Sequence, residues 1–385
     1  MTLTEPFRTI AEIFEKASQA LRPEVWDYLI GGSESEATLC RNRWALDSYE
    51  FVPRVLRDVS TVDLRTSLLG RQSALPVFLA PVGSLRLFDH DAAVASATVA
   101  AAAGVPMFMS IMAEPSLEAV RQQVPKVDLI LQLYMRGGRD WLDGVVQRAE
   151  EAGCVAICLT VDTAVYGRRE RDLRNRFSPA TAVDRANLDD RKSVQIVPEQ
   201  ASLSWETVAW LRQRTRLPLI IKGVMTAEDA SLCADHGVDV VYVSNHGGRQ
   251  LDHSAAAIDQ LAEIFPAVTG RCSVFIDGGM LRGTDVLKAI ALGADGVGLG
   301  KAQGAALAAG GSEALQRLIQ ILTEEIATAL ALLGCSSLSQ LGPGHLRRSA
   351  PVQVPTVLST LRLPASEAAR KQGWWGGGAR LAGIT

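Results

Sequence analysis

The segment VSNHGGRQLD, residues 243–252, places His246 three residues before Arg249, with two glycines between them. A histidine has a pKa near working pH and can act as a general base. An arginine can bind a carboxylate through two parallel hydrogen bonds. A turn alone would need the glycines but neither of these side chains. The segment therefore predicts a site that moves a proton on a substrate carrying a carboxylate.

Other segments supply groups that would complete such a site. Asp162 could hold the imidazole and stabilise its charged form. Arg169, in the segment GRRE, is a second candidate for binding the anion, and Tyr28 and Tyr134 can donate hydrogen bonds from their hydroxyl groups. Lys222 could neutralise negative charge that appears on a cofactor. The five histidines show no metal-ligand spacing, so we expect no metal.

These side chains need elements that bring them together, and the hydrophobic pattern predicts eight strand–helix pairs. Eight apolar runs are continuous rather than alternating, which is typical of strands buried on both faces. They span residues 75–82, 106–110, 128–134, 154–162, 217–224, 238–245, 272–279 and 295–301. Helix-like stretches follow them at residues 91–104, 116–124, 139–153, 204–215, 226–237, 257–268, 283–293 and 312–334. Eight pairs in one series predict an α/β fold, the (β/α)8 TIM barrel, with a doubly wound open sheet as the alternative.

Polar residues and glycines gather at the carboxyl ends of these runs. In a barrel, these ends meet at one mouth, where such enzymes place their active sites. The residues concerned are Pro81, Val82, Gly83, Ser110, Gln132, Tyr134, Thr160, Asp162, Lys222, Ser244, Asn245, His246, Asp277, Gly278, Gly279, Gly300 and Lys301. The segments IDGGMLRG and GLGKA lead into helix N-termini, where backbone N–H groups can hold a phosphate. The sequence therefore predicts a phosphorylated ligand beside the last two strands.

Three segments lie outside the series of strand–helix pairs. We expect residues 1–73 to form an N-terminal helical extension, residues 74–348 the barrel, and residues 349–385 a Gly-rich C-terminal tail. A long polar connection, residues 163–203, follows the fourth strand, and connections of this length are often functional. Its arginine run, residues 168–176, is diluted by Glu170 and Asp172. We interpret that run as a loop with internal salt bridges and one or two arginines turned to the mouth, rather than as a nucleic-acid patch.

The composition argues against several classes of protein. The formal net charge of −3 gives no signature of nucleic-acid binding. No apolar run is long enough to span a bilayer, and the amino terminus lacks the apolar region of a signal peptide. The six cysteines are scattered and form no C-x-x-C motif, which is typical of reduced thiols. We therefore expect a cytoplasmic enzyme without a membrane partner.

Taken together, the motifs resemble the FMN-dependent L-2-hydroxy acid oxidase/dehydrogenase family. They are SNHGGRQLD, LTVDT followed by GRRERDLRNRF, LPLIIKGV, QLY, DGGMLRGTDV and the N-terminal DYLIGGSESEATLCRNR. The similarity extends from about residue 8 to residue 347, and SNHGGRQLD in this context is highly specific. The resemblance implies oxidation of the Cα–OH of a 2-hydroxy carboxylate to a 2-oxo acid, with reduction of FMN. It also implies a homotetramer and reoxidation by oxygen or another electron acceptor.

The resemblance implies a role for each matching residue. The catalytic matches are His246 (base), Asp162 (its partner), Arg249, Arg169 and Tyr28 (substrate carboxylate), Tyr134 (substrate hydroxyl) and Lys222 (flavin N1–C2=O edge). The residues matching the edges of the isoalloxazine ring or ribityl chain are Ser110, Gln132, Thr160 and Ser244. The rest of the cofactor site is expected at Pro81, Val82, Gly83, Asp277, Gly279, Arg282, Gly300 and Lys301. His246 is needed as a base whether the substrate loses a hydride or first forms a carbanion.

Two residues depart from the family pattern at the phosphate. Leu281 stands where the family usually carries Arg or Lys, and Arg282, which follows it, is a candidate substitute. Lys301 replaces an arginine and offers a point charge instead of a planar fork. We therefore expect FMN to bind less tightly than is usual in the family.

The residues expected around the substrate favour a molecule larger than glycolate. Met112 stands where glycolate oxidase-like members carry an aromatic residue, and Val82-Gly83 stands where they commonly carry Thr-Ala. Gly83 leaves room, Met112 is a flexible apolar wall, and Tyr166 adds an aromatic surface. We expect an aryl or branched-alkyl 2-hydroxy acid, such as a mandelate-like one.

Several alternatives remain open at this point. Reduced FMN could pass its electrons to a quinone, a cytochrome or a partner protein, or the enzyme could couple oxygen to monooxygenation or decarboxylation. A different phosphate-binding barrel could use Lys222 as a Schiff base in an isomerase or aldolase. A catalytically silent scaffold is the third alternative, against which the complete set of candidate catalytic residues argues.

Overall fold

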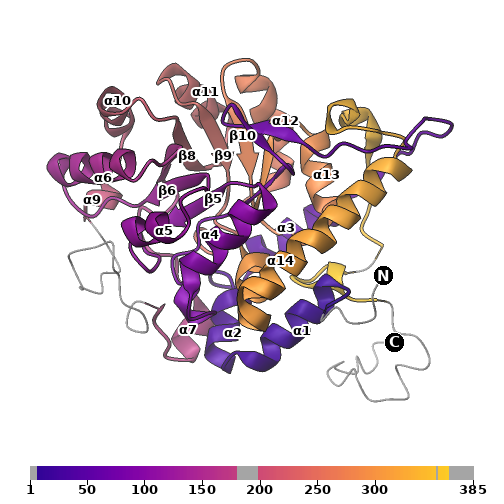
Figure 1. Cartoon of the computed structure of the whole chain (residues 1–385), viewed down its shortest axis with the longest axis horizontal. Helices are drawn as coiled ribbons and strands as arrows, with labels where there is room; N and C mark the ends of the chain where they lie inside the picture. Colours follow the sequence, from indigo (N-terminus) through magenta and orange to yellow (C-terminus); the bar gives the residue numbers. More distant parts are fainter. Residues whose placement is uncertain (1–6, 180–197, 353, 364–385) are drawn as a thin grey trace, which may run out of the picture.

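Eight parallel strands close into a barrel, as the sequence predicted (Figure 1). The computed structural model describes residues 7–179, 198–352 and 354–363. The barrel strands are β4 (Val77–Leu79), β5 (Met107–Ser110), β6 (Leu129–Leu133), β7 (Ala156–Thr160), β8 (Leu219–Val224), β9 (Val240–Val243), β10 (Ser273–Ile276) and β11 (Gly296–Leu299). β11 pairs with β4 in parallel register and closes the circle, so the open-sheet alternative is wrong.

A helix follows each barrel strand and covers the outside of the barrel. These helices are α4 (Ala92–Ala103), α5 (Leu117–Gln123), α6 (Arg139–Glu151), α10 (Trp205–Arg214), α11 (Ala227–Asp235), α12 (Ala257–Val268), α13 (Gly283–Ala291) and α14 (Lys301–Leu332). The last predicted helix, residues 312–334, corresponds to the second part of α14, and the sequence analysis missed the first part. α14 begins at Lys301, directly after β11, and Gly310 and Gly311 interrupt it with non-helical backbone angles. The alanines before this pair extend the helix to the barrel mouth.

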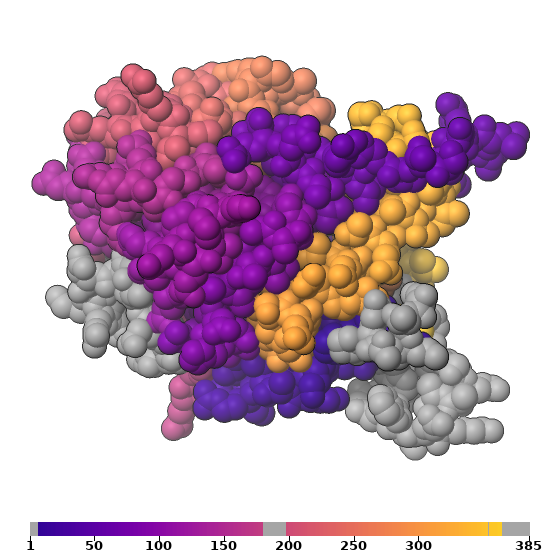
Figure 2. Space-filling view, viewed as in Figure 1, coloured from indigo at the N-terminus to yellow at the C-terminus, as the bar shows by residue number. Residues whose placement is uncertain are grey.

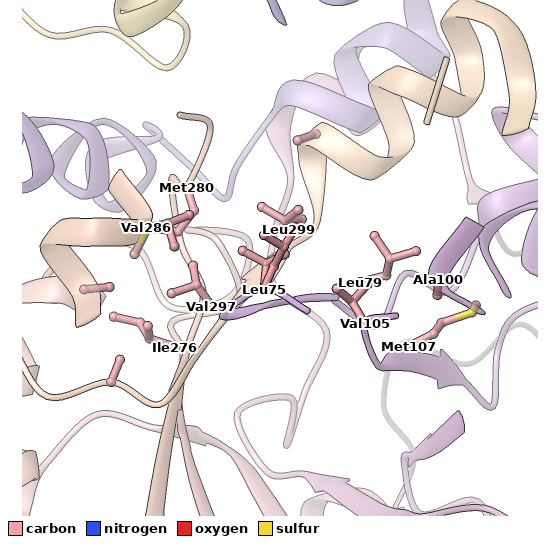
Figure 3. Packing of buried hydrophobic residues seen from close by; sticks show 14 of the residues in the cluster. Leu75, Leu79, Ala100, Val105, Met107, Ile276, Met280, Val286, Val297 and Leu299 are labelled. Atoms are coloured by element: carbon pink, nitrogen blue, oxygen red, sulfur yellow. The ribbon is translucent and has the colours of Figure 1, made fainter. Parts of the chain in front are cut away.

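The strands are continuously apolar because they pack on both sides. Between strands and helices lies the main core, where Leu79, Met107, Ile276 and Leu299 are fully buried (Figure 3). A second apolar cluster fills the barrel interior, and its large side chains are the rings of Phe78, Phe108, Tyr242 and Phe275. The barrel is therefore a packed body with its free space at one end.

The N-terminal extension contains strands as well as the predicted helices. Its elements are α1 (Ile10–Ala20), α2 (Pro23–Ile30), α3 (Ala37–Asp47), β1 (Tyr49–Phe51), β2 (Thr66–Leu68) and β3 (Arg71–Ser73). α1 packs against α14, and Figure 2 shows α1 and α2 in indigo along the lower side of the molecule. β1 pairs with β12 (Leu346–Arg348), while β2 and β3 form a hairpin that adds Leu68 to the barrel interior. Strands of three residues are too short to show a hydrophobic pattern in the sequence.

The long connection after β7 contains the short helices α7 (Glu170–Arg174) and α9 (Pro198–Ala201). α7 contacts α2, and Arg171 forms ion pairs with Asp27 at 2.9 Å and Glu36 at 2.6 Å. Among the described residues, Arg171 of the arginine run therefore pairs with the N-terminal extension, and the expected salt bridges within the loop stay a prediction. The C-terminal Trp-Trp-Gly segment and residues 180–197 lie outside the described residues. Within the described parts of the chain, no helix has the length and apolar character required to cross a membrane.

Candidate active site

A cavity of about 810 Å³ opens at the carboxyl ends of the barrel strands. It is enclosed by strand ends, the long connection and α2 of the N-terminal extension. The sequence-predicted residues that line it are Tyr28, Pro81, Val82, Gly83, Met112, Tyr134, Tyr166, Arg169, Lys222, His246, Arg249, Asp277, Gly279, Gly300 and Lys301. We call the part around Tyr28, Arg169, His246 and Arg249 the substrate end, and the part around Gly279, Leu281, Gly300 and Lys301 the phosphate end.

Other predicted residues lie behind this lining or away from it. Gln132 donates from Nε2 to Thr160 Oγ1 at 2.9 Å, and Ser110 Oγ accepts from the backbone N–H of Met112 at 3.2 Å. Arg282 is not among the residues that line the cavity. Its guanidinium forms an ion pair with Glu325 at 2.8 Å, on the side of α13 that faces α14. The structure therefore gives Arg282 no contact with the phosphate end, because Glu325 holds its charge.

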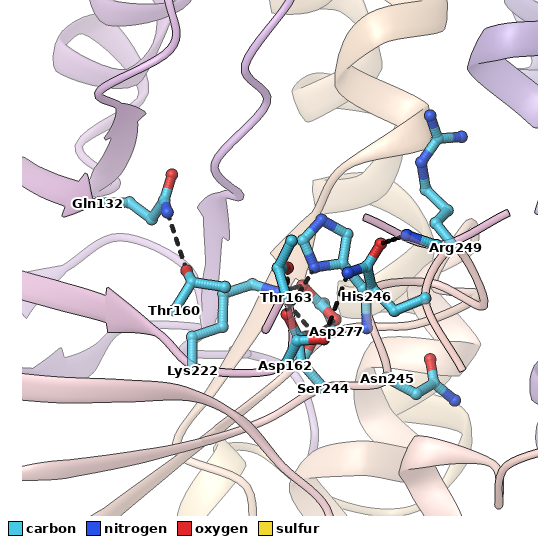
Figure 4. A network of polar contacts seen from close by, with 12 residues as sticks. Gln132, Thr160, Asp162, Thr163, Lys222, Ser244, Asn245, His246, Arg249 and Asp277 are labelled. Carbon is cyan, nitrogen blue, oxygen red and sulfur yellow. Dashed lines mark hydrogen bonds and ion pairs between the residues drawn. The ribbon is translucent and has the colours of Figure 1, made fainter. Parts of the chain in front are cut away.

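His246 and Asp162 form a hydrogen-bonded pair at the cavity wall (Figure 4). The distance between His246 Nδ1 and Asp162 Oδ1 is 2.9 Å. Gly223 on β8 has a φ of 109°, and a Cβ there would lie 2.6 Å from the Cβ of Asp162. Only glycine lets the aspartate lie this close to β8. With Nδ1–H donated to Asp162, the lone pair of His246 Nε2 is left for a substrate proton.

The surroundings of His246 favour the neutral form of its imidazole. Burial lowers the pKa of His246 below its usual value, Asp162 opposes that effect, and Lys222 adds to it. Burial raises the pKa of Asp162, but His246, Lys222 and Thr163 together outweigh that effect, and the net pKa is lowered. Oδ2 of Asp162 is buried and has no hydrogen-bond partner among the described residues. The pair is thus a neutral base beside a carboxylate that can stabilise the charged form.

Two arginines and a tyrosine form the cationic wall of the substrate end. Arg249 donates from Nη1 to the carbonyls of Tyr28 at 2.7 Å and Gly31 at 2.9 Å, and its guanidinium lies 4.7 Å from the Tyr28 ring. Arg169 lies 4.3 Å from the Tyr166 ring. Burial and the neighbouring Arg169 lower the pKa of Arg249. One buried and one partly buried guanidinium group at this wall favour binding of an anion such as a carboxylate.

Sequence reasoning missed a third charged group at this wall. Asp172, on α7, lines the cavity and is 7 % exposed. Burial raises the pKa of its carboxyl group, while Arg169 and Arg249 partly offset that effect. Its position three residues after Arg169 was the available signal, but we interpreted it as a residue that diluted the arginine run.

Lys222 is the buried cation between the two ends. Its Nζ donates to Ser244 Oγ at 2.7 Å and lies 3.4 Å from Asp277 Oδ2 (Figure 4). Burial alone would lower the pKa of Lys222, but Asp277 and Asp162 raise it. The side chain is therefore a protonated ammonium group that lines the cavity.

The phosphate end combines a helix N-terminus, two glycines and a partly buried lysine. Gly300 precedes Lys301, the first residue of α14, and a Cβ at Gly279 would lie 3.2 Å from the Cβ of Asn42. Desolvation, with repulsion from Arg249 and Arg169, lowers the pKa of Lys301 to about 7. A lysine with such a pKa lacks a compensating anion, and a phosphate would supply one. Leu281 lines this end and brings no charge.

Arg43, which the sequence analysis missed, also reaches this end from α3. It donates to both carboxylate oxygens of Asp285 at 2.8 Å and to the carbonyl of Gly279 at 3.3 Å. Arg43 and Asp285 are separated by 242 residues in the chain, so no local pattern could have paired them. Together with Lys301, Lys222 and the space available, these residues are suited to a phosphorylated cofactor with a flat ring that gains negative charge.

The chain belongs to the FMN-dependent dehydrogenase family, whose model matches residues 17–348. This is the family of FMN-dependent 2-hydroxy acid oxidases and dehydrogenases that the motifs indicated, and FMN is the cofactor. Glycolate oxidase of Spinacia oleracea is 40% identical over 343 residues, which cover 86% of this chain and 93% of that protein. Glycolate oxidase 3 of Arabidopsis thaliana is 39% identical, covering 87% of this chain and 94% of that protein.

Solved structures of related enzymes superpose on most of the chain. Mandelate oxidase with (S)-2-phenylpropionate has a TM-score of 0.83 and 39% identity, and the match covers 90% of this chain and 100% of that one. A mutant of the active chimera of (S)-mandelate dehydrogenase has a TM-score of 0.84 and 34% identity, covering 89% and 99%. The chain is therefore similar over nearly its whole described length to both oxidases and dehydrogenases.

Proposed function

We propose that this enzyme oxidises an aryl or branched-alkyl L-2-hydroxy acid, larger than glycolate, with His246 as the base and oxygen as the electron acceptor. The oxidation of a 2-hydroxy acid with FMN follows from the family. The size of the substrate, the roles of the residues and the acceptor are our proposal. The observation that supports it most is a cavity lined by two arginines, Arg169 and Arg249, beside a neutral His246–Asp162 pair.

In the proposed mechanism, the substrate end fixes the substrate before any proton moves. Arg249 and Arg169 bind the carboxylate, and the carbonyl bonds that hold Arg249 keep its guanidinium in place. Burial strongly raises the pKa of Tyr134, so its hydroxyl stays protonated and can donate to the substrate oxygen. The bound carboxylate thereby places the substrate Cα–OH within reach of His246.

His246 Nε2 then takes a proton from the substrate, and Asp162 stabilises the imidazolium that results. FMN supplies the two-electron acceptor for this oxidation. Lys222 brings a positive charge to the place where the resemblance puts the N1–C2=O edge of the ring. The residues perform the same roles whether a hydride leaves Cα or a carbanion forms first.

The walls of the substrate end support a bulky, apolar substrate. Gly83 has no side chain, and a Cβ there would lie 2.9 Å from the Cβ of Met112. Tyr166 and Phe177 also line this end, and the Phe177 ring lies 5.7 Å from the ring of Tyr28. These aromatic and thioether surfaces favour a phenyl or branched-alkyl group over the bare hydrogen of glycolate.

Steady-state kinetics with a panel of L-2-hydroxy acids tests the proposal. We expect a higher kcat/KM for mandelate-like or branched acids than for glycolate, and the highest value for glycolate would contradict the substrate class. Stopped-flow mixing of the reduced enzyme with air tests the acceptor. Slow reoxidation by oxygen and fast reoxidation by a quinone or cytochrome would favour the dehydrogenase alternative, which the similarity to (S)-mandelate dehydrogenase supports.

Assembly and location remain predictions from the sequence. We propose a homotetramer in the cytoplasm, and light scattering on the purified protein measures the first of these.

A further inference from the structure

Tyr242 on β9 is a fully buried residue that the proposed mechanism does not use. Its ring belongs to the aromatic cluster inside the barrel, and its hydroxyl donates to Asp277 Oδ2 at 2.9 Å. Gly298 on β11, two strands from β9 in the barrel, makes this possible, because a Cβ there would lie 2.5 Å from the Tyr242 hydroxyl oxygen. Three strands thus place one phenol hydroxyl directly beneath the cavity.

The hydroxyl controls a carboxylate that Lys222 also approaches. Asp277 Oδ1 accepts from Ser244 Oγ at 2.6 Å, and Oδ2 accepts from Tyr242. Lys222 Nζ gives its short hydrogen bond to Ser244 and stays 3.4 Å from Asp277 Oδ2. Two hydroxyl donors therefore share the negative charge of Asp277, and Lys222 is not drawn into a tight ion pair with it.

We propose that Tyr242 is a positioning residue that sets the reduction potential of the bound flavin through Asp277 and Lys222. The proposal rests on the proposed place of Lys222 beside the flavin ring. Reduction by two electrons with uptake of one proton leaves one negative charge on that ring, and Lys222 stabilises the charge. Burial raises the pKa of Tyr242 well above its usual value, so the phenol remains a donor throughout.

Removing the Tyr242 hydroxyl while keeping the ring tests the effect on the reduction potential without changing the aromatic packing. Tyr242→Phe keeps the ring, which lies 5.0 Å from Lys222 Nζ, and frees one lone pair of Asp277 Oδ2. Asp277 then attracts Lys222 more strongly, less positive charge reaches the flavin, and reduction becomes less favourable. We expect about a five-fold change in the reduction equilibrium, the size typical of the net contribution of one hydrogen bond. This change equals a potential about 20 mV lower for a two-electron couple.

The potential is measured on the FMN-loaded protein by anaerobic titration against a reference dye. Chemical reduction needs no substrate, so the result does not depend on the substrate class. A matched control is Tyr49→Phe, which removes the Tyr49 hydroxyl 3.5 Å from Asp259 and away from the cavity lining. The control should stay within about 5 mV of the wild-type protein. An unchanged or higher potential in Tyr242→Phe would overturn the proposal.

Two further variants keep the test decisive. In a Lys222→Met background, Tyr242→Phe should change the potential by less than about 5 mV, because its effect passes through Lys222. A full effect in that background would also overturn the proposal. If Tyr242→Phe does not fold, Gly298→Ala on β11 pushes the hydroxyl off Asp277 and should lower the potential in the same direction. A wild-type protein that is not reduced by any 2-hydroxy acid would contradict the proposed function and leave this comparison of potentials intact.

Discussion

The two ends of the cavity hold their positive charges in different ways. At the substrate end, Arg249 is fixed by two main-chain carbonyls and packs against the Tyr28 ring. At the phosphate end, Lys301 has a single carbonyl contact, at 3.3 Å to Gly247, and a pKa lowered to about 7 by burial. The substrate end is thus organised before its ligand arrives, whereas the phosphate end gains its full charge only when an anion binds.

The largest effect is expected at the substrate end, from the loss of the base. His246→Asn removes the proton acceptor and leaves a side chain of similar size, so kcat/KM should fall by about 10²- to 10⁴-fold. The bound FMN should keep its absorption spectrum. Steady-state kinetics measures the change, and His90→Asn, at an exposed site, is the matched control. If the kcat/KM of His246→Asn differed from that of the wild type by only a few-fold, roughly the scatter of such measurements, His246 would be excluded as the base.

The pH dependence of the wild-type enzyme provides a second test of the same residue. Because burial lowers the pKa of His246, the neutral base is already dominant below the usual histidine range. The kcat/KM of the free enzyme should therefore rise with pH and reach its plateau below about pH 6.5. A plateau that begins well above that pH would show a base with a raised pKa and contradict the electrostatics of this pair.

A smaller effect on kcat/KM should follow from replacing Arg249, whose guanidinium is fixed before the substrate binds. Arg249→Lys loses the planar fork and the paired bonds to Tyr28 and Gly31. We expect kcat/KM to fall by roughly 10- to 100-fold, the loss typical of one or two hydrogen bonds to a charged group. Arg65→Lys, at an exposed ion pair, provides the control. Equal activity of Arg249→Lys and wild type would mean that the substrate end is not organised around this guanidinium.

At the phosphate end, unlike the substrate end, we expect the binding of FMN to depend on pH through Lys301. Free Lys301 loses its proton as the pH rises through about 7, and phosphate binding must restore that proton. FMN affinity of the apoprotein should therefore fall above pH 7, by at most about tenfold per pH unit. Fluorescence titration measures it. Lys301→Arg should bind FMN with no such dependence, and a wild-type affinity that is flat between pH 7 and 9 would contradict the account.

The smallest effect is expected where the substrate wall is apolar. Met112→Trp fills space beside Gly83 and removes the weak hydrogen bond that Met112 Sδ accepts from Arg136 Nη2 at 3.6 Å. The ratio of kcat/KM for a mandelate-like acid to that for glycolate should fall by about 10-fold, the size of one or two lost methylene contacts. Leu332→Trp, at an exposed position at the end of α14 and outside the cavity lining, serves as the control. An unchanged ratio would mean that Met112 does not set the substrate size.

The fold and the substrate end were predictable because their signals are local. The barrel strands are continuous apolar runs that end in polar residues or glycines, and a barrel brings those ends together. His246, Asp162 and Arg249 could be placed in this way, although only the structure shows the 2.9 Å contact between the first two.

The missed features depend on long-range contacts. Arg43 pairs with Asp285 across 242 residues, and Tyr242 is indistinguishable from its apolar neighbours in VDVVYVSN until Asp277 is seen beside it. Arg282 was proposed for the phosphate end because it follows Leu281 in the sequence, but Glu325 on α14 pairs with its charge. Sequence position alone could not show on which side of the α13 N-terminus that side chain lies.

The most direct test of the account is an anaerobic visible spectrum of the purified protein, recorded before and after addition of individual L-2-hydroxy acids. We expect flavin absorption bands that bleach fastest with an aryl or branched-alkyl acid, and that do not bleach at a comparable rate in His246→Asn. A wild-type flavin that glycolate bleaches fastest, or a His246→Asn flavin that bleaches as fast as the wild type, would contradict the proposed substrate or the proposed base.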